Sequence, residues 1–122
     1  MRLLRMLMLG ALWLVPAAGF AQDEVERFTD ADAANGALLY KRYCSGCHGA
    51  DGRGGAHTFM PHIDSLTRKD YIEYLPDSYL FTVVAEGGEA VGKSGYMLAW
   101  RGTLSEQEIK DIIAHIRTLP TY

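Results

Sequence analysis

Apolar and polar residues follow a helical pattern most clearly near the C-terminal end of the chain. Four isoleucines recur at the i, i+3, i+4 and i+7 spacing of one helical face: Ile109, Ile112, Ile113 and Ile116. Ser105 and Glu108 form a capping-box pattern before them, and Leu104 is placed to join a hydrophobic staple. Pro120 cannot continue a helix. The pattern therefore predicts a helix that starts after Ser105, ends before Pro120 and buries its isoleucine face.

A second helical face occurs earlier in the chain. It consists of Ala33, Gly36, Ala37 and Tyr40. Thr29 or Asp30 is expected to cap this helix, which starts near Asp32. Because glycine costs a helix up to about 1 kcal/mol relative to alanine, Gly36 is expected where a neighbouring element approaches closely; a tolerated weak position is the alternative. The isoleucine face is the best candidate for that neighbour.

The middle of the chain alternates between glycine-rich loops and short apolar stretches. Residues 49–55 contain four glycines and predict a loop, and residues 87–95 predict a second one. Residues 70–75 and 78–85 predict two short helices separated by Pro76. A strand is the alternative for the second of them, which is rich in β-branched and aromatic residues. The elements together predict an all-α fold.

The first 21 residues have the pattern of a secretory signal peptide. Arg2 and Arg5 precede an apolar run of ten residues, 6–15, and small residues at 19 and 21 predict cleavage after Ala21. An uncleaved membrane anchor is the alternative, but the apolar run is shorter than the ~20 residues that span a bilayer. We expect export to the periplasm and no membrane span after cleavage.

Composition sets the domain organisation. A chain of 122 residues predicts one folded domain, which we place at residues 32–120, after an acidic, aperiodic and flexible leader at 22–31. Loss of the positive charges of Arg2 and Arg5 changes the formal net charge from −3 to −5. This balance argues against a nucleic-acid partner, which would require a basic surface.

The chemistry of the chain is concentrated in Cys44-Ser45-Gly46-Cys47-His48. Two cysteines two residues apart, followed at once by histidine, form the attachment signature of a c-type haem. Each thiol adds across one vinyl group of the porphyrin, and His48 is then placed to bind the iron. The signature therefore predicts one haem c, bound covalently through Cys44 and Cys47, with its iron.

Other interpretations of the two cysteines remain open. A Cys-x-x-Cys thiol oxidoreductase is one, although such motifs occur in a βαβ pattern that this chain lacks. A zinc site is another, with further ligands from His57, His62 or His115. Chance occurrence is the third. The specificity of the five-residue motif favours haem.

The order of these parts resembles the bacterial class I, mono-haem cytochromes c. The resemblance covers residues 36–119 and depends mainly on the haem motif. It implies a small cytochrome c fold, in which the N- and C-terminal helices cross and short helices and loops wrap one covalently bound haem. It also implies that Met97 is the distal iron ligand, opposite His48, and that the carbonyl of Pro61 accepts the second imidazole N–H.

The segment around Met97 departs from the family pattern. Similar proteins commonly continue with Pro-Ala-Trp or Pro-Ala-Phe, whereas this chain has Leu98, Ala99 and Trp100. The missing proline puts the stiffness of the loop in question more than the identity of the ligand. Trp100 and Tyr96 are expected to shield the haem.

Other distal ligands remain open at this point. His57 or His62 would give bis-histidine ligation, Met60 would have to approach from the side of His48, and an unfilled distal site is a further alternative. His115 is expected to be a packed or surface side chain.

Two axial ligands leave no site on the iron for a substrate, so the resemblance implies a periplasmic electron carrier and not an enzyme. It would exchange electrons with a donor and an acceptor redox protein, as a monomer or as the dedicated cytochrome subunit of a redox complex. A haem sensor or peroxidase-like protein with a labile or absent distal ligand is the alternative. A haem-free thiol or zinc protein is a third.

Positive residues flank the predicted haem segments. They are Lys41, Arg42, Arg53, Lys93 and Arg101. We expect either a basic rim that steers docking to an acidic partner or a scatter of solvated charges.

Overall fold

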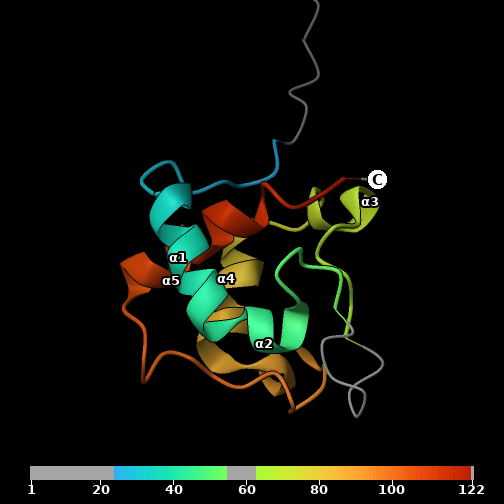
Figure 1. Ribbon diagram of the computed structural model, residues 1–122, viewed down its shortest axis with the longest axis vertical. Coiled ribbons are helices and arrows are strands. Elements are labelled where there is room, and N and C mark those ends of the chain that lie inside the picture. Colours follow the sequence, from blue (N-terminus) through green and yellow to red (C-terminus); the bar gives the residue numbers. More distant parts are fainter. Residues whose placement is uncertain (1–23, 55–62, 122) are drawn as a thin grey trace, which may run out of the picture.

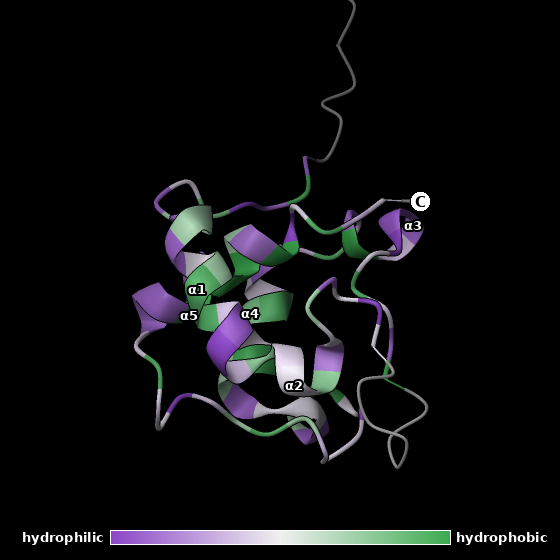
Figure 2. Cartoon of the chain, viewed as in Figure 1, coloured by the Kyte–Doolittle hydropathy of each residue, from purple (hydrophilic) through white to green (hydrophobic). Residues whose placement is uncertain are grey.

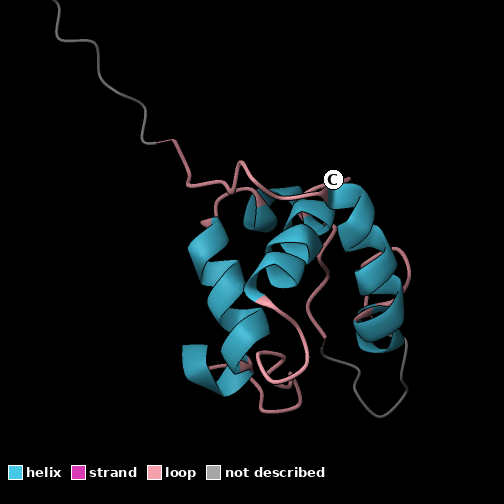
Figure 3. Cartoon of the chain, turned by 90° about the vertical axis from the view of Figure 1, so that its left-hand side faces the viewer, coloured by secondary structure: helices cyan, strands magenta, loops and turns pink. Residues whose placement is uncertain are grey.

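The computed structural model describes residues 24–54 and 63–121 of the chain. The helices in these ranges are α1 (Ala33–Tyr43), α2 (Ser45–His48), α3 (Lys69–Ile72), α4 (Asp77–Glu86), the 3₁₀ helix η1 (Gly88–Val91) and α5 (Glu106–Ile116). No strand occurs within these ranges (Figures 1 and 3). The all-α prediction is therefore confirmed, and the strand alternative for residues 79–85 is wrong because they belong to α4.

Several predicted features lie outside the described residues. These are the signal peptide at 1–21 with its cleavage point, and His57, Met60, Pro61 and His62.

Helix α5 forms as its sequence predicts. The Ser105 hydroxyl accepts from the Glu108 N–H at 3.2 Å, and the Glu108 carboxylate accepts from the Ser105 N–H at 2.8 Å. The four isoleucines are buried, together with Leu104. Burial of each such side chain contributes about 1.5–3 kcal/mol, so the isoleucine face anchors the core. Figure 2 shows the hydrophobic residues gathered where α1, α4 and α5 meet.

Gly36 lies where α1 packs against α5, the most extensive helix contact in the described fold. A Cβ at Gly36 would overlap the backbone carbonyl of Asp111 and lie 3.0 Å from the Ile112 nitrogen. The prediction that Gly36 admits a close neighbour, and that α5 is this neighbour, is confirmed.

The N-cap of α1 differs from the prediction. Asp32 caps the helix, and its carboxylate accepts from the N–H groups of Ala34 and Asn35 at 2.8 and 3.2 Å. Asp30, one of the two predicted caps, pairs instead with Lys110 at 2.9 Å. The caps at Thr29 and Asp30 are wrong because the helix begins only at Ala33, and an N-cap side chain reaches no further than the first turn.

A buried carboxylate joins the first turn of α1 to α5. Asp111 is 4% exposed and accepts from the Asp32 N–H at 2.8 Å, the Asn35 amide at 2.8 Å and the Gln107 amide at 3.0 Å. Burial acts to raise the pKa of Asp111, but these hydrogen bonds to the charged form outweigh it and hold the pKa below its usual value. The carboxylate thus contributes to the α1–α5 contact as an anion.

Part of the predicted flexible leader belongs to the folded domain. The Phe28 N–H donates to Asp77 Oδ2 at 2.6 Å, and the Asp77 N–H donates to the Glu26 carbonyl at 3.1 Å. The Phe28 ring meets that of Phe81 edge-on, with 6.2 Å between centroids. Residues 26–28 of the predicted leader therefore pack on α4. The partners of these residues lie about fifty residues away in the sequence. The local sequence therefore contains no periodic pattern that would predict the contacts.

Candidate cofactor site

A cavity of about 580 Å³ lies between the helices and the loop that precedes α5. This volume is in the range of cofactor and ligand sites. Most of the predicted site residues line it: Cys44, Cys47, His48, Met97 and Trp100. Apolar side chains of α4 and α5 form much of the remaining wall. The fold therefore brings together segments that are about fifty residues apart in sequence.

The Cys-x-x-Cys-His motif is a short helical turn that continues from α1. The Cys44 N–H donates to the Tyr40 carbonyl at 2.8 Å, and the His48 N–H donates to the Cys44 carbonyl at 3.0 Å. Gly49 then ends α2 with φ of +79°, a conformation that favours glycine. Local helical hydrogen bonds thus place both thiols and the imidazole on one cavity wall.

The turn after His48 is fixed from two sides. The Tyr40 hydroxyl donates to the Gly49 carbonyl at 2.8 Å, and the Gly54 N–H donates to the His48 carbonyl at 2.7 Å. Burial raises the pKa of Tyr40, so its hydroxyl remains a donor at neutral pH. These bonds hold the backbone of His48 in place without occupying its imidazole.

The imidazole of His48 has one buried nitrogen that is available for a further hydrogen bond. Its Nδ1 is buried and has no hydrogen-bond partner among the described residues. Burial lowers the pKa of His48, which favours the neutral imidazole. A neutral imidazole has one lone pair for a metal and one N–H that needs an acceptor. The acceptor implied by the family resemblance, the Pro61 carbonyl, lies outside the described residues.

The cysteines also suit covalent attachment. Both are free thiols, and burial, followed by the charge of Cys47, raises the pKa of Cys44 to about 11. Cys44 is therefore protonated at neutral pH, in the S–H form that is added across a vinyl group. Two thiols, a neutral imidazole and an apolar cavity together fit a haem c.

Met97 lines the cavity from the loop before α5. Backbone hydrogen bonds hold this loop: the Gly88 N–H donates to the Met97 carbonyl at 2.9 Å, and the Trp100 N–H donates to the Val84 carbonyl at 3.0 Å. A Cβ at Gly88 would overlap the carbonyl oxygen of Ser94, so the loop lies directly against η1. These bonds connect the segment to the end of α4 and to η1.

The residues on either side of Met97 contribute to the cavity as well but differ in their exposure to solvent. Tyr96 and Leu98 are 76% and 63% exposed, while Met97 is partly buried. Trp100 is also partly buried, and its ring centroid lies 5.5 Å from that of Tyr43. Trp100 therefore forms part of the cavity wall. Tyr96 also lines the cavity, and its high exposure places it at the mouth.

Some cavity residues were missed in the sequence. Tyr43 lies four residues before Cys47 and so shares its helical face, and Leu80 and Val84 have the same i, i+4 spacing in α4. This spacing could have identified all three. His115 packs on Tyr40, with 5.0 Å between ring centroids, and agrees with the prediction of a packed side chain. In the described part of the chain, no three His, Cys, Asp or Glu side chains form a metal cluster.

Comparisons with known proteins agree with this site. The family model described as "Cytochrome C oxidase, cbb3-type, subunit III" matches residues 31–116. The cbb3-type cytochrome c oxidase subunit FixP of Bradyrhizobium diazoefficiens is 28% identical over 88 residues, as is FixP of Bradyrhizobium sp. (strain ORS 278). Each alignment covers 72% of this chain but 28% of the relative, so the chain spans little more than a quarter of their length.

Solved structures show the same fold. The KustC0563 c-type cytochrome matches with a TM-score of 0.60 and 20% identity, over 70% of this chain and 98% of the other. Cytochrome cL of the marine methylotroph Methylophaga aminisulfidivorans matches with a TM-score of 0.58 and 25% identity, over 78% and 59% of the two chains. The matched family, the neighbours and the cavity agree: the chain belongs to the cbb3-type cytochrome c oxidase subunit III family and is a class I cytochrome with one covalently bound haem c.

Proposed function

We propose that this protein is a periplasmic electron carrier whose haem c is attached through Cys44 and Cys47 and held between His48 and Met97. Membership of the family assigns a haem c electron-transfer role. The observation that carries the finer proposal is that His48 and Met97 line the same cavity from segments about fifty residues apart.

The haem iron, when bound, supplies a one-electron Fe(III)/Fe(II) couple. His48 offers a neutral nitrogen, and the thioether of Met97 is a soft ligand that favours Fe(II). The apolar wall formed by residues such as Leu80 and Val84 disfavours the additional positive charge of Fe(III). Both effects raise the reduction potential. With both axial positions filled, the protein exchanges electrons and does not bind a substrate on the metal.

The structure of the Met97 loop supports a firm distal ligand. The alternative of a sensor or peroxidase-like protein depends on a labile loop, suggested by the missing proline. Three backbone hydrogen bonds connect this loop to the end of α4 and to η1, with Gly88, Val84 and Ala85 as the partners. This anchoring favours the carrier over the alternative.

The carrier acts between a donor and an acceptor redox protein, either free as a monomer or as the dedicated cytochrome of a redox complex. The names of the FixP relatives place those proteins in an oxidase, which supports the second arrangement. No helix in the described ranges is long and apolar enough to cross a membrane. The periplasmic location is supported by the signal peptide predicted at residues 1–21.

Replacement of the two mature-chain methionines tests the ligand assignment. Met97→Ala should retain covalently bound haem and lose the sulfur-to-iron charge-transfer band in the far red. Met60→Ala is the matched control and should keep this band. Persistence of the band in Met97→Ala, or its loss in Met60→Ala, would contradict the assignment. A histidine ligand would leave both variants with the spectrum of the unaltered protein.

A further inference from the structure

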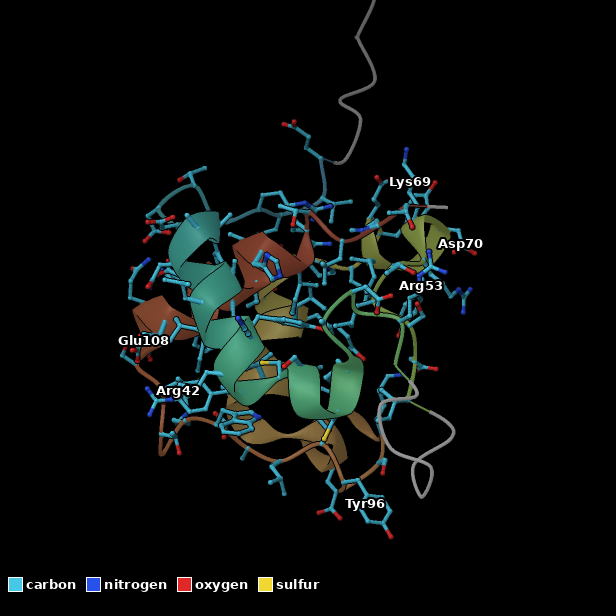
Figure 4. All side chains as sticks on the ribbon, viewed as in Figure 1. Arg42, Arg53, Lys69, Asp70, Tyr96 and Glu108 are labelled. Carbon is cyan, nitrogen blue, oxygen red and sulfur yellow. The ribbon has the colours of Figure 1, made fainter. Side chains whose placement is uncertain are left out.

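Two of the most exposed apolar side chains lie at the mouth of the cavity. Among the described residues, the large hydrophobic side chains most exposed to solvent are Leu38, Tyr74, Tyr96 and Leu98, at 71, 74, 76 and 63%. Of these, Tyr96 and Leu98 line the cavity. A residue that both lines a cavity and is mostly exposed lies at its rim. Figure 4 shows Tyr96 at the lower edge of the molecule, beneath α2 and pointing outward.

The positive charges near this rim are largely compensated by acidic partners. Arg101 pairs with Glu86 at 2.5 Å and with Glu106 at 3.3 Å, and Lys93 pairs with Asp64 at 3.4 Å. Lys93 and Arg101 belong to the predicted basic rim. An ion pair presents little net field to a protein that approaches across salt solution.

The other members of the predicted rim are Lys41, Arg42 and Arg53, and within the described residues only Arg53 among them forms an ion pair. Arg53 pairs with Asp51 at 3.4 Å, and Figure 4 shows Arg53 far from Tyr96. Arg42 lies over the ring of Tyr43, 5.2 Å from its centroid, and keeps its charge.

The carboxylate of Glu89 lies beside Gly95, the residue before Tyr96: a Cβ built at Gly95 would lie 2.5 Å from Glu89 Oε1. The second acid on Arg101, Glu106, and the carboxylate of Glu89 offset the charges of Arg42 and Lys41 in number. The surface around Tyr96 thus has apolar groups at its centre and balanced charges at its edge.

We propose that Tyr96 and Leu98 form a docking patch for a redox protein that presents an uncharged, apolar surface around its own redox centre. The proposal rests on the electron-transfer function above. Exposed apolar groups gain by being covered, and a partner with compensated or no charge is the electrostatic match for this rim. An acidic partner would meet no uncompensated positive field here. Because the patch is small, the complex is transient, at the low end of interface sizes.

Electron self-exchange between reduced and oxidised copies tests the patch, because a second copy supplies the same uncharged surface. Tyr96→Lys and Leu98→Lys place a charge in the patch, whereas Tyr74→Lys and Leu38→Lys add the same charge at equally exposed positions that do not line the cavity. Measured by NMR line broadening, exchange should slow about tenfold in the patch variants, since like charges then face each other. The controls should stay within about twofold, the small effect expected of a remote surface charge.

Serine variants at the same four positions separate lost apolar contact from added charge. Tyr96→Ser and Leu98→Ser should also slow self-exchange, and Tyr74→Ser and Leu38→Ser should not. Equal effects at all four positions, or no effect at any, would overturn the patch.

Oxidation of the reduced protein by ferricyanide tests the charge balance separately. One electron passes from the haem iron to this anionic probe. If the positive charges of the rim are compensated, the net negative charge of the chain repels ferricyanide, and salt screens this repulsion. The rate of oxidation should then rise with ionic strength. A rate that falls with salt would reveal a basic rim and overturn the proposal.

Failure of the patch and failure of the proposed function give different results. Each variant is first reduced and oxidised while its optical spectrum is recorded. A protein that cannot be cycled reversibly contradicts the electron-transfer function itself. Reversible cycling with exchange rates that do not depend on Tyr96 and Leu98 contradicts the patch alone.

Discussion

The cavity wall that carries His48 is continuous in sequence, whereas the wall that carries Met97 is assembled from separated segments. α1 runs directly into α2, and hydrogen bonds between residues four apart connect Tyr40, Cys44 and His48. The Met97 loop instead takes its support from Val84, at the end of α4, and from Gly88 in η1. One wall is local structure, and the other depends on tertiary contacts.

This difference explains why only one wall is evident from a short motif. A helix needs only its own backbone to position Cys47 and His48. The Met97 loop instead depends on backbone bonds to distant residues: the Met97 carbonyl accepts from the Gly88 N–H, and the Trp100 N–H donates to the Val84 carbonyl. None of these bonds involves the side chain that follows Met97. Leu98 occupies the proline position of the family without loss of these bonds.

Removal of the proximal ligand should have the largest effect of any change to either wall. His48→Ala should prevent formation of stable holoprotein, because the proximal bond is lost. Covalent haem per chain, measured by absorbance of the purified protein, gives the result. His115→Ala is the control, since His115 packs on Tyr40 and does not line the cavity, and it should retain haem. Full haem content in His48→Ala would show that the motif does not position the proximal ligand.

Separation of α1 from α5 should disturb the His48 wall next most strongly. Gly36→Ala gains up to about 1 kcal/mol in helix propensity. However, its Cβ meets the backbone carbonyl of Asp111, which cannot turn aside. Overpacking of this kind should dominate and destabilise the fold by about 3 kcal/mol. Chemical unfolding of the holoprotein measures the difference.

Gly102→Ala is the matched control for this change, because a Cβ at Gly102 has no neighbour within 4 Å. Its free energy of unfolding should remain within about 0.5 kcal/mol of the parent. Equal stability of the two variants would contradict close α1–α5 packing at Gly36.

Disturbance of the second wall should release Met97 without releasing the haem. Gly88→Ala forces its Cβ onto the carbonyl of Ser94 and moves the backbone that bonds the Met97 carbonyl. We expect a loss of about 2 kcal/mol in loop stability, seen as a weaker far-red band at unchanged haem content. Gly92→Ser, in contrast, meets no neighbour but has φ of +73°, and should strain the backbone without changing the band. A full-strength band in Gly88→Ala would show that these backbone contacts do not hold the ligand.

The smallest effect is expected where Asp111 joins α1 to α5. The depressed pKa of Asp111 means that its contribution is present above the unfolded value of about 3.9 and is lost as pH falls through the lower folded value. Asp111→Asn should cost about 1–2 kcal/mol near pH 7. Its stability should also fall less steeply below pH 4 than that of the parent. Acid unfolding followed by circular dichroism measures both, and parallel acid curves would contradict this role.

Features set by local sequence were predictable, and features set by distant contacts were not. The capping box of α5 and its buried isoleucines follow from spacing alone, and Gly36 identifies the helix contact. The cap of α1 was misplaced because Asp30 and Asp32 are equally suitable in sequence; in the structure Asp30 pairs with Lys110, while the Asp32 carboxylate accepts from the first turn of the helix.

Contacts between remote segments leave no signal in the local sequence. The bonds of residues 26–28 to the start of α4 have no local pattern. The sequence left a basic rim and a scatter of solvated charges both open, because the partners of Lys93 and Arg101, Asp64 and Glu86, lie elsewhere in the sequence. Tyr96 was expected to shield the haem; it lines the mouth of the cavity and is 76% exposed, an exposure that its place beside Met97 does not reveal.

The optical spectrum of the purified protein, oxidised and reduced, with a pyridine haemochrome, tests the central claim most directly. A haem c held between His48 and Met97 predicts one covalently bound haem per chain, a low-spin spectrum in both states and a far-red band in the oxidised state. A protein without covalently bound pigment, or one whose haem has an open axial position, would contradict the account.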